Sequence, residues 1–79
     1  MACNETIRLA NRDWPLNRTT ESGLCCYVVV VGSVDDAAEV AADAETKPNY
    51  VRRSQFYDVP DNKIRFYLYF QPEGKSPRE

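Results

Sequence analysis

Four acidic side chains gather on one face of a predicted helix, with no Lys or Arg between them. Spacings of three, four and seven residues span roughly 4.5, 6 and 10.5 Å along a helix axis, which is comparable to the phosphate spacing that a basic nucleic-acid groove expects. Two interpretations stay open: carboxylates that mimic phosphates, or a solvated helix face whose acids are favoured by the helix dipole. The four candidate partner-binding residues are Asp35, Asp36, Glu39 and Asp43.

A second group combines cations with aromatic rings near the C-terminal end. This composition is typical of platforms for single-stranded nucleic acid and of protein-binding hot spots. The alternative is a tyrosine row that shields one sheet face from water. Residues 63–70 fail the RNA-recognition signature at both small positions and at its first aromatic position, which argues against RNA binding by that route. This alternative surface comprises Arg52, Arg53, Arg65, Tyr67 and Tyr69.

The remaining composition argues against catalysis. The chain of 79 residues contains no histidine, which removes Ser-His and Cys-His nucleophile pairs and the commonest metal ligand. Its three cysteines include no C-x-x-C pair, so they cannot form a four-ligand zinc site on their own. No phosphate loop, nucleophile elbow or calcium loop is present. We therefore predict no enzyme activity, no catalytic residue, no metal site and no cofactor.

The cysteines and the apolar runs predict the compartment. An odd number of cysteines, with Cys25 and Cys26 adjacent, fits no disulfide framework, so we expect three reduced thiols. The first residues do not form a signal peptide. The longest apolar run, Leu24–Val31, is far shorter than the ~20 residues of a membrane-spanning helix. We expect a soluble, cytoplasmic protein.

The clearest structural pattern is an apolar strand followed by a helix. Leu24–Val31 is rich in β-favouring residues and apolar on both faces, which predicts a central strand with a helix on one face and the other face at least partly covered, a second copy of the chain being one candidate for the cover. Ser33 is a typical N-cap, so the next segment predicts a helix over residues 34–45, ending before Pro48. Its predicted apolar face comprises Val34, Ala37, Val40, Ala41 and Ala44.

The C-terminal part predicts a hairpin. One strand covers residues 50–58, a turn covers 59–63, and a second strand covers 64–71. The register stays open because two-residue and three-residue loops differ by one step. One face of the second strand is predicted to carry Ile64, Phe66, Leu68 and Phe70.

Residues 4–14 allow two interpretations. Residues 6–10 can form a strand that pairs with the central strand, or Asn4 can cap a short helix with its apolar residues at helical spacing. We favour the strand, because a central strand needs a neighbour. Residues 14–23 then become a connecting loop, anchored on the core by Trp14.

These elements define the predicted fold. It is an α+β domain in which one amphipathic helix covers one face of a four-stranded antiparallel sheet, in the order β-β-α-β-β. The domain is expected to span residues 1–71, and residues 72–79 are expected to form a flexible tail.

Residues 24–45 resemble a construction that is common in very small proteins of bacteriophages and mobile elements. The shared features are a strand, a Ser-x-x-Asp/Glu-Ala turn and an alanine-rich helix, and they cover about a quarter of the chain. Anti-CRISPR proteins are among the proteins that it resembles. This resemblance implies a small, acidic, non-enzymatic inhibitor that presents carboxylates to the Lys/Arg channel of a CRISPR surveillance complex.

The predicted function combines these observations. We expect a phage-encoded inhibitor in the cytoplasm of a bacterial host cell, which blocks a nucleic-acid-binding surface of a defence complex through its acidic helix. The expected partner is a bacterial protein or ribonucleoprotein complex with a basic surface, and no membrane is involved. Direct nucleic-acid binding by the Arg/Tyr hairpin is an alternative that the net charge of −2 argues against. The second alternative is a homodimer that serves as a structural or regulatory module.

Overall fold

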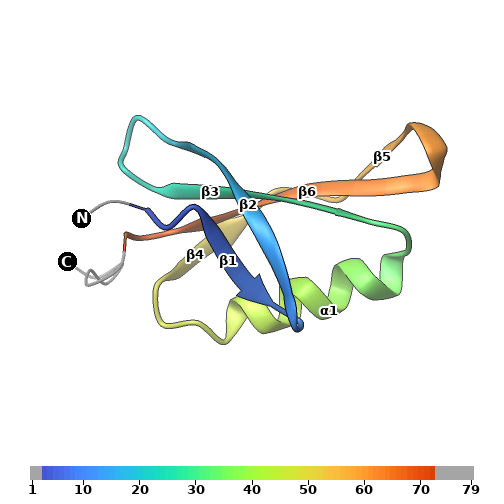
Figure 1. Cartoon of the computed structure of the whole chain (residues 1–79), viewed down its shortest axis with the longest axis horizontal. Helices are drawn as coiled ribbons and strands as arrows, with labels where there is room; N and C mark the ends of the chain where they lie inside the picture. The colour runs from blue at the N-terminus through green and yellow to red at the C-terminus, as the bar shows by residue number, and fades with distance from the viewer. Residues whose placement is uncertain (1–2, 73–79) are drawn as a thin grey trace.

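Six strands and one helix account for most of residues 3–72, the part of the chain that this computed structural model describes. The strands form one curled antiparallel sheet, and the helix packs inside the curl (Figure 1). In chain order the elements are β1 Thr6–Leu9, β2 Arg12–Thr19, β3 Cys25–Val31, α1 Val34–Glu45, β4 Tyr50–Arg53, β5 Tyr57–Val59, a 3-10 turn at Pro60–Asn62, and β6 Lys63–Phe70.

This mostly-β architecture corrects the predicted four-stranded α+β sheet. The chain order is β-β-β-α-β-β-β instead of β-β-α-β-β. Across the sheet the strands lie in the order β1-β2-β3-β6-β4, and β5 pairs with the other end of β6. Two segments cause the difference, since residues 12–19 are a strand instead of a loop and residues 50–58 contain two strands instead of one.

The N-terminal hairpin is the larger departure from the prediction. β1 is a strand, as favoured, but it pairs with β2 and not with β3. Ala10 and Asn11 connect the two strands with positive φ angles of 52° and 61°, the conformation of a type I′ hairpin turn. Such turns are normally recognised in a sequence by the pairs Asn-Gly or Asp-Gly. The turn here is Ala10-Asn11, so the sequence lacks this signal for a hairpin. Pro15 lowered the strand propensity of β2 further.

A bulge in β2 curls the sheet. The first half of β2 pairs with β1 and the second half with β3, and the register shifts between Leu16 and Arg18. Because a bulge bends its strand and increases the local twist, the β1–β2 hairpin turns towards one end of α1 (Figure 1). There the Ala10 backbone N–H donates to Oδ2 of Asp43 at 2.9 Å. This contact ties the hairpin to the helix.

β3 and β6 form the centre of the sheet, with continuous pairing from Cys25 opposite Phe70 to Val31 opposite Ile64. The predicted central position of the apolar strand is confirmed. The predicted partner strand is interrupted at Ser54, whose N–H donates to the Tyr67 carbonyl and whose Oγ accepts from the Tyr67 N–H at 2.8 Å. Since the side chain replaces a ladder contact, β4 ends there and β5 begins three residues later.

The helix has the predicted bounds, and Ser33 caps it by accepting the Asp36 N–H at 3.1 Å. Its small side chains let it lie close to the sheet, where Phe66 and Leu68 are fully buried. Val34 was wrongly assigned to the apolar face, since it is 63% exposed. The buried helix residues are Ala37, Val40, Ala41 and Ala44.

Two of the three cysteines form a disulfide, which corrects the expectation of three reduced thiols. Cys3 bonds to Cys25 across 22 residues of sequence, and Cys26 is free and buried. Neighbouring side chains in a strand point to opposite faces, so Cys25 lies on the helix side and Cys26 on the other. The odd number of cysteines could not predict this bond. Of the adjacent pair, only Cys25 lies on the side from which it can reach Cys3.

Residues 73–79, most of the predicted tail, lie outside the described residues. Pro72, where that tail was predicted to start, is buried. Within residues 3–72, no helix combines the length and the apolar character that crossing a bilayer requires.

Candidate functional site

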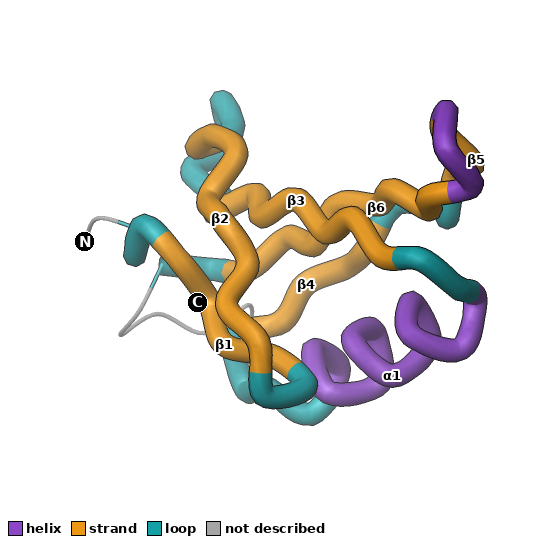
Figure 2. The backbone as a smooth tube through the Cα atoms, turned by 45° about the vertical axis from the view of Figure 1, so that its right-hand side comes forward, coloured by secondary structure: helices purple, strands orange, loops and turns teal. Residues whose placement is uncertain are grey.

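The two faces of the sheet differ in what covers them. One face of the sheet packs on α1. Within residues 3–72, no helix or strand covers the opposite face of β3 and β6 (Figure 2). We call this second surface the open face. Cross-strand pairing and side-chain alternation define its members. They include Arg18 on β2, Cys26, Val28 and Val30 on β3, Arg65, Tyr67 and Tyr69 on β6, Arg52 on β4, and Tyr57 on β5.

Cations and aromatic rings dominate the open face. Arg18 pairs with Cys26, Cys26 with Tyr69, and Tyr69 with Arg52, so one row across four strands carries an arginine at each end. The Arg52 guanidinium lies 4.7 Å from the centre of the Tyr69 ring. None of these open-face positions is acidic, and the nearest carboxylate on this side of β2, that of Asp13, pairs with Arg8. Arg18 and Arg65 form no ion pair with residues 3–72. These cations are therefore available to an anionic ligand.

The phenol of Tyr69 stays protonated at neutral pH. Partial burial raises its pKa, and neighbouring Cys26 raises it further, while Arg18 and Arg52 act in the opposite direction. A protonated phenol can donate a hydrogen bond. The open face therefore presents donors next to its cations.

The structure brings together four of the five residues predicted for the alternative surface. Arg52, Arg65, Tyr67 and Tyr69 share the open face, but Arg53 does not. Arg53 lies opposite the buried Leu68, and its guanidinium lies 4.6 Å from the centre of the Phe56 ring. Consecutive residues of a strand point to opposite sides, so adjacent arginines could not both serve one face.

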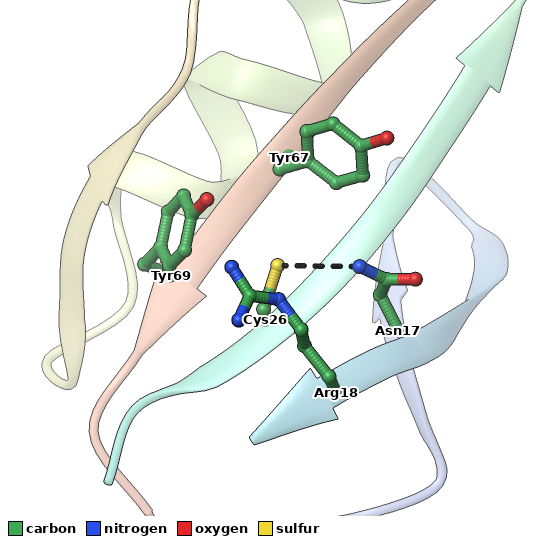
Figure 3. Close-up of a pocket in the computed structure, with 5 residues that line it drawn as sticks. All are labelled: Asn17, Arg18, Cys26, Tyr67 and Tyr69. Atoms are coloured by element: carbon green, nitrogen blue, oxygen red, sulfur yellow. Dashed lines mark hydrogen bonds between the residues drawn. The ribbon is translucent and has the colours of Figure 1, made fainter. Parts of the chain in front are cut away.

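A hollow of about 270 Å³ lies at the β2 end of the open face (Figure 3). Sequence reasoning missed three of its residues because it treated residues 14–23 as a loop and the cysteines only as buried hydrophobes. Alternation along residues 12–19, had they been recognised as a strand, would have indicated Asn17, whereas Arg18 reaches this face only through the register shift between Leu16 and Arg18. The residues that line the hollow are Asn17, Arg18, Cys26, Tyr67 and Tyr69.

The acidic helix face lies on the other side of the sheet. Asp35, Asp36 and Glu39 are exposed and form no ion pair with residues 3–72. Asp43 differs, because its half-buried carboxylate accepts the Ala10 N–H and lies 3.8 Å from the Lys47 ammonium. The helix thus offers three uncommitted carboxylates, and the fourth holds the N-terminal hairpin in place.

The pKa of Asp43 is lowered below its ordinary value of 3.8. The main cause is the hydrogen bond from the Ala10 backbone, with smaller contributions from Lys47 and Thr46, while burial acts in the opposite direction. A carboxyl whose pKa is lower in the folded state stabilises the fold above its unfolded pKa, and this stabilisation is lost as the pH falls through the folded pKa. Asp43 therefore stabilises the protein at neutral pH, and this contribution begins to decline only as the pH falls below 3.8, towards the lowered folded pKa.

We expect Asp43→Asn to lower the free energy of unfolding by about 1 kcal/mol at pH 7, because the charge-assisted bond to Ala10 becomes a neutral one and the Lys47 contact is lost. At pH 3 the difference from the unmodified protein should shrink. Urea unfolding at both pH values measures this. Glu39→Gln, on the exposed helix face, is the matched control and should change stability at neither pH. An Asp43→Asn effect of equal size at both pH values would contradict the assignment.

Among residues 3–72, no group of three or more His, Cys, Asp or Glu side chains could hold a metal ion. The chain matches none of the family models, curated proteins or solved structures with which it was compared.

Proposed function

We propose that this protein is a non-enzymatic binding protein that holds single-stranded nucleic acid on its open face. The observation that supports this best is the row of Arg18, Tyr69 and Arg52 across the sheet, with Tyr67 beside it. Proteins that bind single strands without sequence preference combine a basic surface that follows the backbone with aromatic rings on which bases stack. The alternative surface, and not the acidic helix, is therefore the main binding site in this proposal.

The distribution of charge removes the main objection to nucleic-acid binding. The net charge is −2, but the acidic helix residues lie on the far side of the sheet from the arginines. Exposed charges separated by more than ~8 Å are largely screened at physiological salt. A strand on the open face would therefore be attracted by Arg18, Arg52 and Arg65, with little opposition from Asp35, Asp36 and Glu39.

The same features disfavour a dimer through the open face. A two-fold interface there would place the same arginine-rich surface on both sides. None of the residues paired across the strands with Arg18, Arg52 and Arg65 is acidic, so these partners would not neutralise them. Self-association through this surface would be repulsive at low salt.

The proposal is tested by titrating the protein into fluorescein-labelled (dT)12 and recording fluorescence anisotropy. Tyr67→Ala should weaken binding by about 10-fold or more, because base–aromatic stacking contributes ~1–3 kcal/mol per base. Tyr67→Phe keeps the ring and is the matched control, so it should bind nearly as well as the unmodified protein. Equal affinities of the alanine and phenylalanine variants would contradict a stacking role.

A second candidate function is the inhibitor inferred from sequence. Three exposed carboxylates with no ion-pair partner in residues 3–72 support it: Asp35, Asp36 and Glu39. In this proposal they bind a basic surface of a bacterial defence complex, and the protein is phage encoded. Retention of a bacterial protein after nuclease treatment of a lysate, and its loss in a variant with these three residues changed to Lys, would favour it over the first.

The cytoplasm of a bacterial cell is the proposed location for either function. The Cys3–Cys25 disulfide is more typical of oxidising compartments. Thiol labelling of Cys3 in freshly lysed cells distinguishes the two environments. A labelled Cys3 indicates a reducing compartment, and a protected Cys3 an oxidising one.

A further inference from the structure

We infer that the hollow between β2, β3 and β6 is a subsite for one nucleobase and that it prefers keto bases, thymine or uracil and guanine, over cytosine and adenine. This inference rests on the proposed function and specifies it. Figure 3 shows the hollow, with Asn17 and Arg18 from β2 facing Tyr67 and Tyr69 from β6.

The bulge in β2 builds this hollow. In a regular strand, Asn17 and Arg18 would point to opposite faces, because successive side chains alternate. The register shift between Leu16 and Arg18 breaks that alternation, and both residues line the hollow. Bulges often re-aim a side chain next to a functional site. Here the bulge places two polar side chains beside the aromatic row.

The size of the hollow suits a single base. Its volume of about 270 Å³ lies just below the range of ~300–1,000 Å³ that is usual for drug-sized ligands. Cys26, which is 1% exposed, forms its floor. A planar base fits such a space.

One of the two tyrosines has its ring free for stacking. The Tyr69 ring is already covered by the Arg52 guanidinium. The Tyr67 ring makes no ring–ring or cation contact with residues 3–72. A base in the hollow would therefore stack on Tyr67.

The polar groups of the hollow are mostly donors. Arg18 forms no ion pair or hydrogen bond through its guanidinium with residues 3–72, and it can offer two parallel N–H groups. Asn17 uses its Nδ2 only for a long contact to the Cys26 sulfur at 3.9 Å. Guanine and thymine present acceptor oxygens where adenine and cytosine present amino donors. A donor-rich site therefore selects the keto bases.

The experiment compares (dT)12 with (dC)12 by anisotropy at one salt concentration; the two bases differ in the group at C4, in the proton at N3 and in the thymine methyl. The unmodified protein should bind (dT)12 about 10-fold more tightly. Arg18→Lys keeps the positive charge but loses the bidentate fork, and Asn17→Ala removes the amide. Both variants should lose most of the preference, measured as the ratio of the (dT)12 and (dC)12 affinities of each variant. Arg8→Lys, on the far hairpin, is the matched control and should retain the preference.

Each outcome separates this inference from the proposed function. Equal binding of the two oligonucleotides by the unmodified protein would overturn the base subsite and leave the nucleic-acid proposal standing. A preference that survives in both Arg18→Lys and Asn17→Ala would overturn the assignment of the hollow. Absence of binding to either oligonucleotide would overturn both.

Discussion

Changing Arg52 and Arg65 together to Glu is expected to weaken the binding of (dT)12 by about 100-fold. Each change replaces an attraction to a phosphate of about 1 kcal/mol with a repulsion of similar size, and salt screening reduces the sum of these effects. Both side chains are exposed, so the fold should tolerate the substitutions. Anisotropy titrations of the variant and the unmodified protein at 50 mM salt measure the change.

The matched control for this prediction changes the same net charge elsewhere. Arg8 and Arg12 lie on the β1–β2 hairpin, where Arg8 pairs with Asp13 and Arg12 lies over the Trp14 ring. Arg8→Glu/Arg12→Glu should weaken binding by only a few-fold, because it adds the same negative charge at a distance from the open face. Similar losses in the two double variants would show that net charge, and not the open face, governs binding.

Reducing the Cys3–Cys25 disulfide is expected to lower the free energy of unfolding by about 3 kcal/mol. The bond closes a loop with a sequence separation of 22 residues, and releasing it restores the conformational freedom of that loop to the unfolded chain. In a domain of this size, such a loss corresponds to a fall of more than about 10 °C in Tm. Urea unfolding with and without a phosphine reductant measures it.

The control for the disulfide prediction is Cys3→Ala. This variant should have the stability of the reduced protein, and reductant should not change it further, because Cys26 is buried and free. Sensitivity of Cys3→Ala to reductant would mean that another bond contributes. Unchanged stability of the unmodified protein on reduction would contradict the prediction.

The part of the fold that could be predicted is the part where local and tertiary preferences agree. Residues 34–45 have a capping serine, acids in the first turn and apolar residues at helical spacing, and α1 has these bounds. The alternation of Ile64 to Phe70 gave the buried face of β6 correctly. In both elements the spacing of apolar residues along the sequence predicts which side chains are buried.

The part that could not be predicted depends on contacts between distant segments. β2 carries a proline and mostly polar residues, and it is a strand because it lies between β1 and β3. The Ala10-Asn11 turn adopts positive φ without glycine, and it is supported by the hydrogen bond that the Ala10 N–H donates to the Asp43 carboxylate on the helix. Neither feature has a local signal, so the sheet was predicted with too few strands.

The candidate site was missed for the same reason. Tyr67 and Tyr69 could be placed on one face from the alternation of β6 alone. Arg18 and Asn17 could not be added to that face until β2 was known to be a strand with a bulge. Arg53 was wrongly grouped with Arg52, because consecutive residues of a strand point to opposite sides whatever the register, and Arg53 lies opposite the buried Leu68.

The central claim is that the open face binds single strands through three arginines, and the salt dependence of affinity tests it most directly. Neutralising Z phosphates on a single strand gives a slope of about −0.7Z in a plot of log K against log salt concentration. With Arg18, Arg52 and Arg65 in contact, we expect a slope of about −2 for the unmodified protein with (dT)12 between 50 and 300 mM salt. A slope near zero, or no binding at 50 mM salt, would contradict the account.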